Sequence, residues 1–198
     1  MRYFAIFLVF IALILFGIVI FGGNSGSKSN KSTSSSSVQA PKALPDYADT
    51  GAIVRLTTDG PINGDDIHRQ IQLTVSSTTR TLDIIQGYQG TVIQTESFAN
   101  NEPAYSAFLN ALYKSGYTLK LTSKQNKFAS DSDQGSCPLG DRYYYQLMNT
   151  DNNADQSLWS SSCGKTVPGN FGGAGPLVQQ LFQVQFGNYN VFTQNVGI

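Results

Sequence analysis

The chain has 198 residues, a formal net charge of +0 and only 13% charged residues, while 12% of its residues are aromatic. This composition supplies enough apolar material for a folded core. It argues against a nucleic-acid partner, which would require clustered Lys and Arg. The one loose group of basic residues is typical of a solvated face; it comprises Lys114, Lys120, Lys124 and Lys127.

The first feature in chain order is an apolar run. From Tyr3 to Phe21 no residue is charged, and as an α-helix this segment would span roughly 28 Å, which matches the hydrocarbon core of a bilayer. The run exceeds the ~7–15 apolar residues of a signal peptide, and no small-x-small cleavage motif follows it. We therefore predict a transmembrane anchor over residues 1–22 with a short cytoplasmic end, and keep a cleaved signal peptide as the alternative.

The composition then changes to GGNSGSKSNKSTSSSSVQA, beginning at Gly22. Ser, Gly, Asn and Lys cannot bury apolar surface, so residues 23–45 are predicted to form a flexible linker. About 20 such residues have a root-mean-square reach of ~25 Å. A single folded domain is expected over residues 46–198.

Four short runs that favour β-strands open this domain, and segments rich in turn residues separate them. In the second run Ile71, Leu73 and Val75 share one face, and polar residues occupy the other. Such alternation predicts an antiparallel meander of three or four strands with one polar face. The runs are AIVRLTT from Ala52, HRQIQLTVSS from His68, RTLDIIQ from Arg80 and TVIQTES from Thr91.

The period then changes to that of a helix. Asn100 or Asn101 is suited to cap its N-terminus, Pro103 suits the first turn, and Gly116 suits the position after its end. The helix should cover the apolar face of the sheet with a stripe at helical spacing. That stripe is expected to consist of Ala104, Phe108, Ala111 and Leu112.

The C-terminal part offers further elements. YTLKLTS, from Tyr117, is a candidate strand, and RYYYQLMNT and SLWSSS are expected to pair as a hairpin through DNNADQ. PLVQQLFQVQF suits a second helix with Pro176 in its first position, and the tail YNVFTQ is left open between strand and coil. The fold class is therefore α+β: an antiparallel sheet, made of a meander plus a C-terminal hairpin, with one or two packed helices and a preceding transmembrane helix. The apolar positions of the second helix are expected to be Leu177, Leu181, Phe182 and Val184.

The only two cysteines flank the predicted hairpin. Cys137 precedes its first strand and Cys163 ends its second, so antiparallel pairing brings them to the separation that a disulfide requires. Disulfides persist outside the reducing cytosol. This pair therefore predicts an extracytoplasmic domain on a single-pass protein of the cell membrane.

Three consecutive tyrosines lie in the hairpin. In a strand Tyr143 and Tyr145 share one face and Tyr144 takes the other. We expect two of the rings to pack with Trp159, and the third to face out or to lie against a helix. Packing is favoured over an aromatic platform for a sugar or a peptide.

Several short motifs lack residues that a phosphate, calcium, zinc or catalytic site requires. CGKT lacks the Gly of a phosphate loop, because Trp159 stands where that Gly is required. DNNADQ has Gln156 and Ser162 at positions where a tight calcium loop needs Gly and Glu, so a polar turn is favoured over a weak calcium contact. His68 is the only histidine and is interpreted as a structural residue, because zinc needs three or four ligands and no nucleophile motif accompanies it. No catalytic residue, metal ligand or cofactor is predicted.

The predicted anchor and Ser-rich linker precede a domain that contains the runs SFANNEPAYSAFLNALYKSGY, CPLGDRYYYQL and VQQLFQVQFGNY. In these features the chain resembles uncharacterised membrane-anchored proteins from candidate-phyla bacteria of the Saccharibacteria type. The resemblance covers most of the domain and implies a bacterial surface protein without a known activity. Type IV pilins also combine an N-terminal apolar helix, an antiparallel sheet and a disulfide near the C-terminus. This chain lacks their processing Gly followed by Phe-Thr-x-x-x-Glu.

These observations predict a non-enzymatic surface module that binds a partner protein or an envelope glycan. Its recognition surface is expected among exposed Tyr, Asn and Gln residues around Tyr88, Tyr105 and the Gly-rich loop near Phe171. Two alternatives stay open. One is an envelope hydrolase or transferase with two carboxyl groups about 5–9 Å apart, and the other is a pilin-like assembly subunit.

Overall fold

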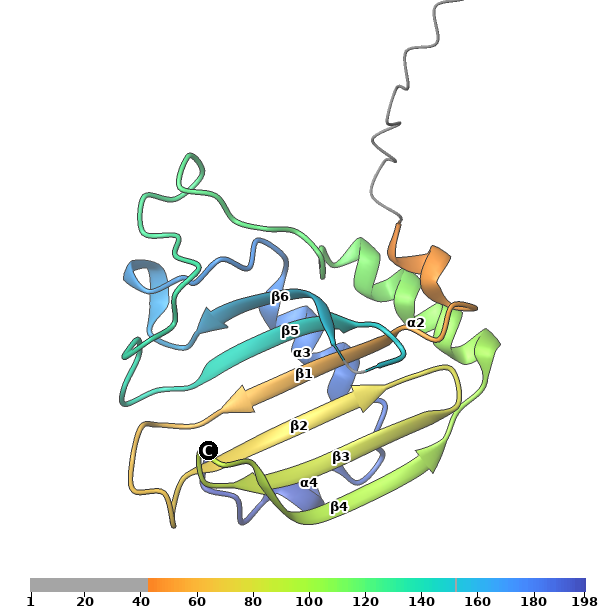
Figure 1. Ribbon diagram of the computed structural model, residues 1–198, viewed down its shortest axis with the longest axis horizontal. Coiled ribbons are helices and arrows are strands. Elements are labelled where there is room, and N and C mark those ends of the chain that lie inside the picture. The colour runs from red at the N-terminus through yellow and green to blue at the C-terminus, as the bar shows by residue number, and fades with distance from the viewer. Residues whose placement is uncertain (1–42, 152) are drawn as a thin grey trace, which may run out of the picture. The chain divides into compact units, whose positions relative to one another are not determined.

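The computed structural model describes residues 43–151 and 153–198 (Figure 1). The predicted anchor and nearly all of the predicted linker lie outside the described residues. Among the helices of the described part, none is both long enough and apolar enough to cross a membrane.

Six strands form one antiparallel sheet in the order β4-β3-β2-β1-β5-β6. The first four follow one another as a meander, and β5 and β6 form a hairpin that pairs with the remaining side of β1. This topology confirms the predicted α+β class with a meander and a C-terminal hairpin. The strands are β1 (Ile53–Asp59), β2 (Arg69–Val75), β3 (Thr79–Gln86), β4 (Thr91–Ala99), β5 (Arg142–Met148) and β6 (Ala154–Ser161).

The helices pack on one face of this sheet, and α3 and α4 lie behind it in the view of Figure 1. Asn101 caps α2 as expected, since its side chain accepts a hydrogen bond of 3.0 Å from the backbone N–H of Ala104. The helices are α2 (Glu102–Lys114), α3 (Gly175–Gln183) and α4 (Tyr189–Thr193), with short 3-10 helices η1 (Leu44–Tyr47) and η2 (Gly164–Thr166).

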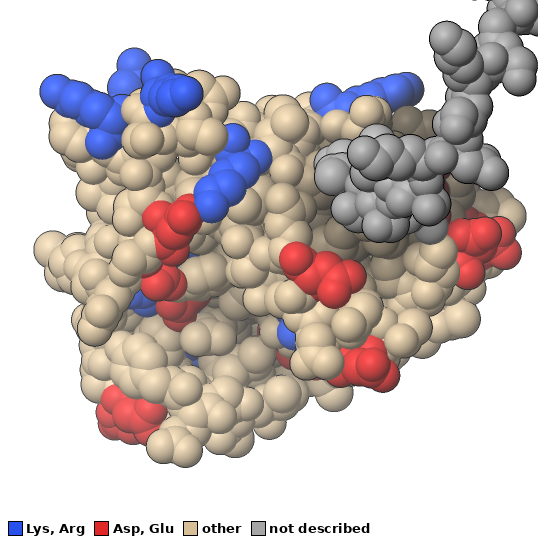
Figure 2. Space-filling view, turned by 45° about the horizontal axis from the view of Figure 1, so that its top comes forward, with Lys and Arg blue, Asp and Glu red and all other residues tan. Residues whose placement is uncertain are grey.

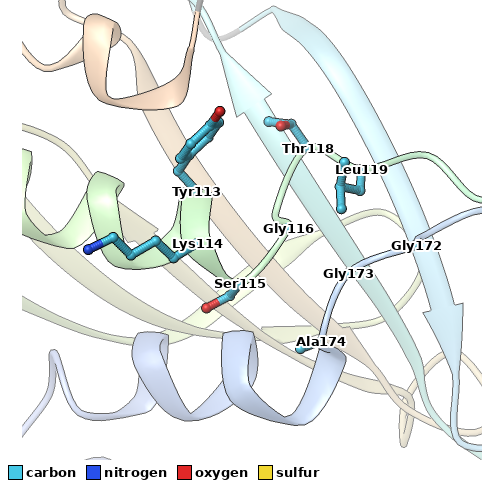
Figure 3. Close-up of a pocket in the computed structure, with 9 residues that line it drawn as sticks. All are labelled: Tyr113, Lys114, Ser115, Gly116, Thr118, Leu119, Gly172, Gly173 and Ala174. Carbon is cyan, nitrogen blue, oxygen red and sulfur yellow. The ribbon is translucent and has the colours of Figure 1, made fainter.

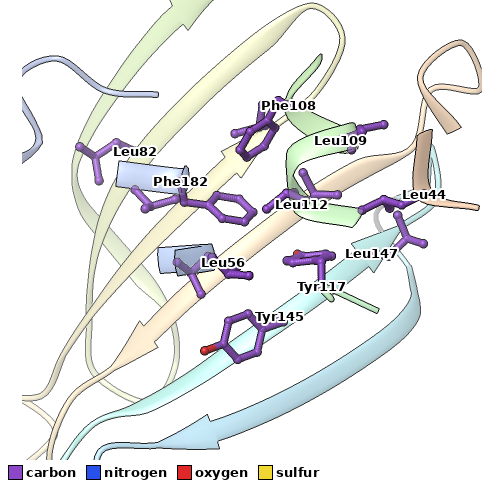
Figure 4. Close-up of a cluster of buried hydrophobic side chains, with 14 of the residues drawn as sticks. Leu44, Leu56, Leu82, Phe108, Leu109, Leu112, Tyr117, Tyr145, Leu147 and Phe182 are labelled. Atoms are coloured by element: carbon purple, nitrogen blue, oxygen red, sulfur yellow. The ribbon is translucent and has the colours of Figure 1, made fainter. Parts of the chain in front are cut away.

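The core lies between the helices and the apolar face of the sheet (Figure 4). Phe108 of α2 and Phe182 of α3 meet edge to face with ring centroids 5.2 Å apart. Just after α2, the Tyr117 hydroxyl shares its one proton between the backbone carbonyls of Arg55 (2.8 Å) and Gln146 (2.9 Å). Because those residues belong to β1 and β5, this one side chain fixes the end of α2 against the middle of the sheet.

Several expected helical positions and elements are wrong. In α2 the buried stripe is Tyr105, Phe108, Leu109 and Leu112, while Ala104 is exposed. In α3 the buried residues are Val178 and Phe182, whereas Leu177 and Val184 face solvent. Residues 117–123 form no strand and contribute one isolated bridge, between Lys120 and Phe171. The tail at residues 189–193 is helix α4 rather than strand or coil.

The expected partner of Trp159 is also wrong. The register of β5 and β6 places Trp159 opposite Tyr144, on the face of the sheet away from the helices. There the Trp159 Nε1–H donates to the Ser130 carbonyl at 2.9 Å, and the Tyr144 hydroxyl donates to the Asp133 carboxylate. The long loop before β5 therefore covers the polar face of the sheet at β5 and β6.

The predicted disulfide is present. Cys137 and Cys163 are bonded, with their Cα atoms 5.6 Å apart. The bond joins the segment before β5 to the segment after β6, and closes a loop with a sequence separation of 26.

Replacing both cysteines by Ser should lower the free energy of unfolding by about 3–4 kcal/mol, because a loop of this length loses substantial entropy in the unfolded chain when it is closed. Urea unfolding of the wild-type and double-Ser domains would measure the difference. An unchanged unfolding midpoint would show that the bond does not constrain the unfolded state.

Alkaline pH should destabilise the domain through its buried tyrosines. Burial raises the pKa of Tyr105, and it raises the pKa of Tyr117 despite two backbone hydrogen bonds that act in the opposite direction. A folded-state pKa above the unfolded value of about 10 gives stabilisation that is fully present below pH ~10 and is lost as the pH rises further. The ultraviolet absorbance of tyrosinate, followed with circular dichroism, should show these two rings ionising only as the domain unfolds. Ionisation of Tyr105 and Tyr117 in a still folded domain would contradict this.

Candidate functional site

Three loops meet at one end of the sheet. In an antiparallel sheet the end of β1, the end of β3 and the beginning of β5 lie at the same end, and the register pairs Asp59 of β1 with both Gln70 and Arg142. We call residues 60–68, 87–90 and 135–141 the tip. The domain begins with η1, which packs on α2 toward the opposite end of the sheet (Figure 1).

A buried cluster of ionisable side chains, made of Asp59, His68 and Arg142, lies directly under the tip. Asp59 Oδ2 is 2.6 Å from Nη2 of Arg142, and Asp59 Oδ1 is 2.8 Å from Nε2 of His68. His68 is fully buried, and the other two residues are also buried. Charges are rarely buried unless they are paired, so this cluster holds β1, β5 and the β1–β2 loop in fixed relative positions.

Backbone carbonyls complete the surroundings of the cluster. The Arg142 guanidinium donates to the Gly60 carbonyl at 2.9 Å, and Nδ1 of His68 lies 3.1 Å from the Pro61 carbonyl. Because a carbonyl oxygen only accepts, Nδ1 carries the proton in this contact. The contact between His68 Nε2 and Asp59 Oδ1, at 2.8 Å, is close but is not a well-directed hydrogen bond.

Tyr88 closes the cluster from above. Its ring stacks on the His68 ring with centroids 4.1 Å apart and planes 12° apart. Its hydroxyl donates to the Asn63 carbonyl at 3.0 Å and accepts from the Asn63 N–H at 3.1 Å. The β3–β4 turn is thereby fastened to the β1–β2 loop, and His68 is separated from solvent.

The approach of these two loops depends on Gly87. A Cβ at this position would lie 2.8 Å from Oδ1 of Asp65, and the same oxygen accepts a hydrogen bond of 2.8 Å from the Tyr88 N–H. The φ angle of Gly87 is +72°, a region that side chains disfavour. A glycine is therefore required where the turn contacts the neighbouring loop.

The third loop is held by backbone bonds and by the disulfide. The Ile62 N–H donates to the Pro138 carbonyl at 2.8 Å, and Cys137 is bonded to Cys163. The Ser162 N–H donates to the Asp141 carbonyl at 3.0 Å. Each loop of the tip is thus fixed to a neighbouring segment by contacts beyond its own strands.

Large aliphatic side chains nevertheless point outward from this rigid frame. Leu139 is 89% exposed, Ile67 is 59% exposed and Ile62 is 42% exposed. Ile62 adjoins Leu139 through its bond to Pro138, and Tyr88, itself 52% exposed, adjoins Asn63. Grouped, exposed apolar side chains on loops held by a rigid scaffold are typical of a protein-binding surface.

The charges around this surface are mainly acidic. Asp65 and Asp66 are exposed in the β1–β2 loop and Asp141 is half-buried before β5, while Lys165 lies in η2 on the far side of the disulfide. Figure 2 shows that charged side chains on the displayed face are scattered among uncharged surface, with Lys and Arg mainly along one border. The tip therefore suits a partner with apolar groups and some positive charge.

A second surface feature is a groove of about 430 Å3 between the end of α2 and the beginning of α3 (Figure 3). Its floor is backbone, because a Cβ at Gly173 would lie 2.4 Å from the carbonyl oxygen of Gly116. Tyr113 and Leu119 are exposed at its rim, and Lys114 is the one charged side chain among the residues that line it. The groove offers a contact surface without paired titratable groups.

The residues expected to form the recognition surface lie in different environments. Tyr88 is exposed at the tip. Tyr105 is fully buried with its hydroxyl donating to the Ala52 carbonyl at 2.7 Å, and Phe171 is buried against the Tyr145 ring at a centroid distance of 3.8 Å. The expectation that these two rings are exposed is therefore wrong.

Sequence reasoning missed the aliphatic residues of the tip. Ile62 and Ile67 lie within PINGDDIH, and Leu139 lies within CPLGD. Large apolar residues between turn-forming residues cannot belong to the periodic face of a strand, so their isolation in polar loops was a usable signal. His68 is fully buried, which agrees with its interpretation as a structural residue.

Comparison with models of known families, with curated proteins and with solved structures gave no match.

Replacing Asp59 by Asn should destabilise the domain by about 3–5 kcal/mol, because it leaves Arg142 and His68 buried without their anionic partner. Asp155→Asn, at an exposed position at the start of β6, is the matched control and should change stability little. Denaturant unfolding measures both, and hydrogen exchange should show faster exchange in residues 60–68 of the Asp59 variant. Equal stability of the two variants would show that the buried cluster does not hold the tip.

Proposed function

We propose that the chain is a membrane-anchored, extracytoplasmic binding module that docks a partner protein with its tip. The observation that carries this proposal is the combination of exposed Ile62, Ile67 and Leu139 with loops that are rigidly held from below. In a loop without such support, exposed aliphatic side chains would be free to turn inward.

Rigidity supports a binding role on energetic grounds. Association costs roughly 0.5–1.5 kcal/mol for each flexible side chain that becomes ordered, and more when loops must also be ordered. The buried cluster of Asp59, Arg142 and His68, the stacking of Tyr88 on His68 and the disulfide fix the three loops before any partner binds. The free energy gained by burying the aliphatic side chains is then not offset by a cost of ordering the loops.

The course of the chain is consistent with this role. The domain begins at η1, at the end of the sheet that is remote from the tip (Figure 1). With the predicted linker over residues 23–45 and the predicted anchor before it, the attachment point and the tip belong to opposite ends of the domain. A tether attached in this way leaves the tip free to reach a partner.

A protein partner is favoured over a glycan. Sugars are typically recognised on open faces of aromatic rings, and at the tip one face of the Tyr88 ring is occupied by His68. The remaining apolar side chains there are aliphatic. The enzyme alternative gains no support from the Asp59–His68 pair, because His68 is fully buried and has no access to a substrate.

Photo-crosslinking in the producing cells tests this function with the full chain. A photoreactive amino acid at position 139 should yield an adduct of one defined mass. The same residue at position 177, an exposed leucine on α3, should not. Ile62→Asp and Ile67→Asp should each reduce the adduct from position 139 at least roughly tenfold, since each buries a charge in an apolar contact.

Thermal unfolding must first show that both Asp variants retain the wild-type melting temperature. Adducts of equal yield from positions 139 and 177, or no adduct from position 139, would overturn the proposal. An adduct to a cell-wall glycan in place of a protein would select the glycan alternative.

A further inference from the structure

The two edges of the sheet are treated differently by the chain. At the β6 edge, the N–H groups of Asn170 and Phe171 donate to the Trp159 carbonyl at 3.0 Å and 2.9 Å. The Trp159 N–H in turn donates to the Asn170 side chain at 2.8 Å. The segment before α3 thereby occupies the middle of this edge.

A glycine makes that coverage possible. A Cβ at Gly169 would lie 2.1 Å from the Trp159 carbonyl oxygen, and the φ angle of Gly169 is +73°. The covering segment could not approach β6 this closely with any other residue at the position. Coverage of the β6 edge is thus a specific feature of the fold.

The β4 edge has no such cover among the described residues. β4 pairs only with β3, and every residue from Thr91 to Ala99 except Glu96 and Phe98 is exposed. Val92 and Ile93 are about half exposed. A nine-residue edge strand with free outer backbone groups and apolar side chains is a template for another strand.

The usual protection of an edge strand is also sparse here. Lys and Pro are the residues that most often block edge pairing, and neither occurs between Thr91 and Ala99. The single charge, Glu96, accepts a hydrogen bond from the Asn188 side chain. One bulge interrupts the pairing of β3 and β4 near Ile93, which leaves Gln94–Ala99 as the regular part of the edge.

From this contrast we propose that β4 pairs antiparallel with β4 of a second copy of the chain and joins the two sheets into one. The interface is distinct from the tip and goes beyond the proposed docking function. A two-fold axis requires the same patch on both copies to be self-complementary, so the distribution of charge along β4 decides whether a second copy fits.

One register places a favourable partner opposite the single charge of β4. When Thr95 of one copy lies opposite Thr95 of the other, Gln94 of each copy lies opposite Glu96 of its partner. Each carboxylate then faces a neutral amide. Pairing about Glu96 would place the two carboxylates opposite each other, which is destabilising. Charge therefore excludes the register centred on Glu96, and the amide opposite each carboxylate favours the register centred on Thr95. In that register the two Thr95 side chains face each other on the polar side of the sheet.

Thr95→Cys tests the register directly in the full chain in its membrane or in detergent micelles. Directly opposed residues of an antiparallel pair have Cβ atoms about 4.5–5.5 Å apart, close enough for a small adjustment to form a disulfide. Mild oxidation should give a linked dimer on a non-reducing gel. Ser157→Cys, an exposed position on β6, is the matched control and should crosslink at least roughly tenfold more slowly.

A second variant separates pairing from incidental collision. Ile93→Lys adds a charge to the edge without touching the core and should abolish crosslinking of Thr95→Cys. Equal rates for Cys at positions 95 and 157, or rapid crosslinking that survives Ile93→Lys, would overturn the proposal. Leu139→Asp should leave this crosslinking unchanged, so that failure of edge pairing and failure of the tip function remain distinguishable.

Discussion

The buried contact of the Asp59 carboxylate with the Arg142 guanidinium and the His68 imidazole organises the tip of this domain. Asp59 is the last residue of β1, Arg142 is the first residue of β5, and His68 precedes β2. Removing one member leaves an uncompensated buried charge, which costs far more than the intact cluster contributes in net stability. The cluster is thus better understood as fixing the relative positions of loops than as a source of overall stability.

The domain buries several large tyrosine side chains completely but leaves some aliphatic side chains exposed. Even large tyrosines such as Tyr105 and Tyr117 are buried with their hydroxyls bonded to backbone carbonyls, so the core tolerates polar groups when each has a partner. At the tip, by contrast, Leu139 is almost fully exposed although its loop is well fastened. An exposed leucine on a well-fastened loop is what the proposed docking role of the tip requires.

The sequence predicted the elements whose signals are local. Alternation marked the strands, Asn101 and Gly116 marked the ends of α2, and the positions of the cysteines marked the disulfide. Sequence-based prediction failed where the result depends on which face of a helix or strand a residue occupies. In α2, Phe108 and Leu112 are buried as expected, but the other buried positions are Tyr105 and Leu109. In the hairpin, the cross-strand register places Trp159 on the face of Tyr144.

The candidate site was less predictable than the fold, for a physical reason. Asp59, His68 and Arg142 come from three separate segments, and only the strand order β2-β1-β5 places them together. Tyr88 was singled out as an exposed tyrosine, but its stacking on His68 follows from the contact of two loops. Contacts made by side chains far apart in sequence leave no periodic pattern for single-sequence reasoning to detect.

The tip and the β4 edge are linked by the chain itself. β4 begins directly after the turn that carries Tyr88. The stacking of Tyr88 on His68 positions this turn, and it therefore also positions the beginning of the unpaired β4 edge. Antiparallel pairing of two such edges places the two tips at opposite ends of the shared strand pair, because the two β4 strands run in opposite directions. A pair of copies would therefore present its docking surfaces apart from each other, and edge pairing would leave both tips accessible.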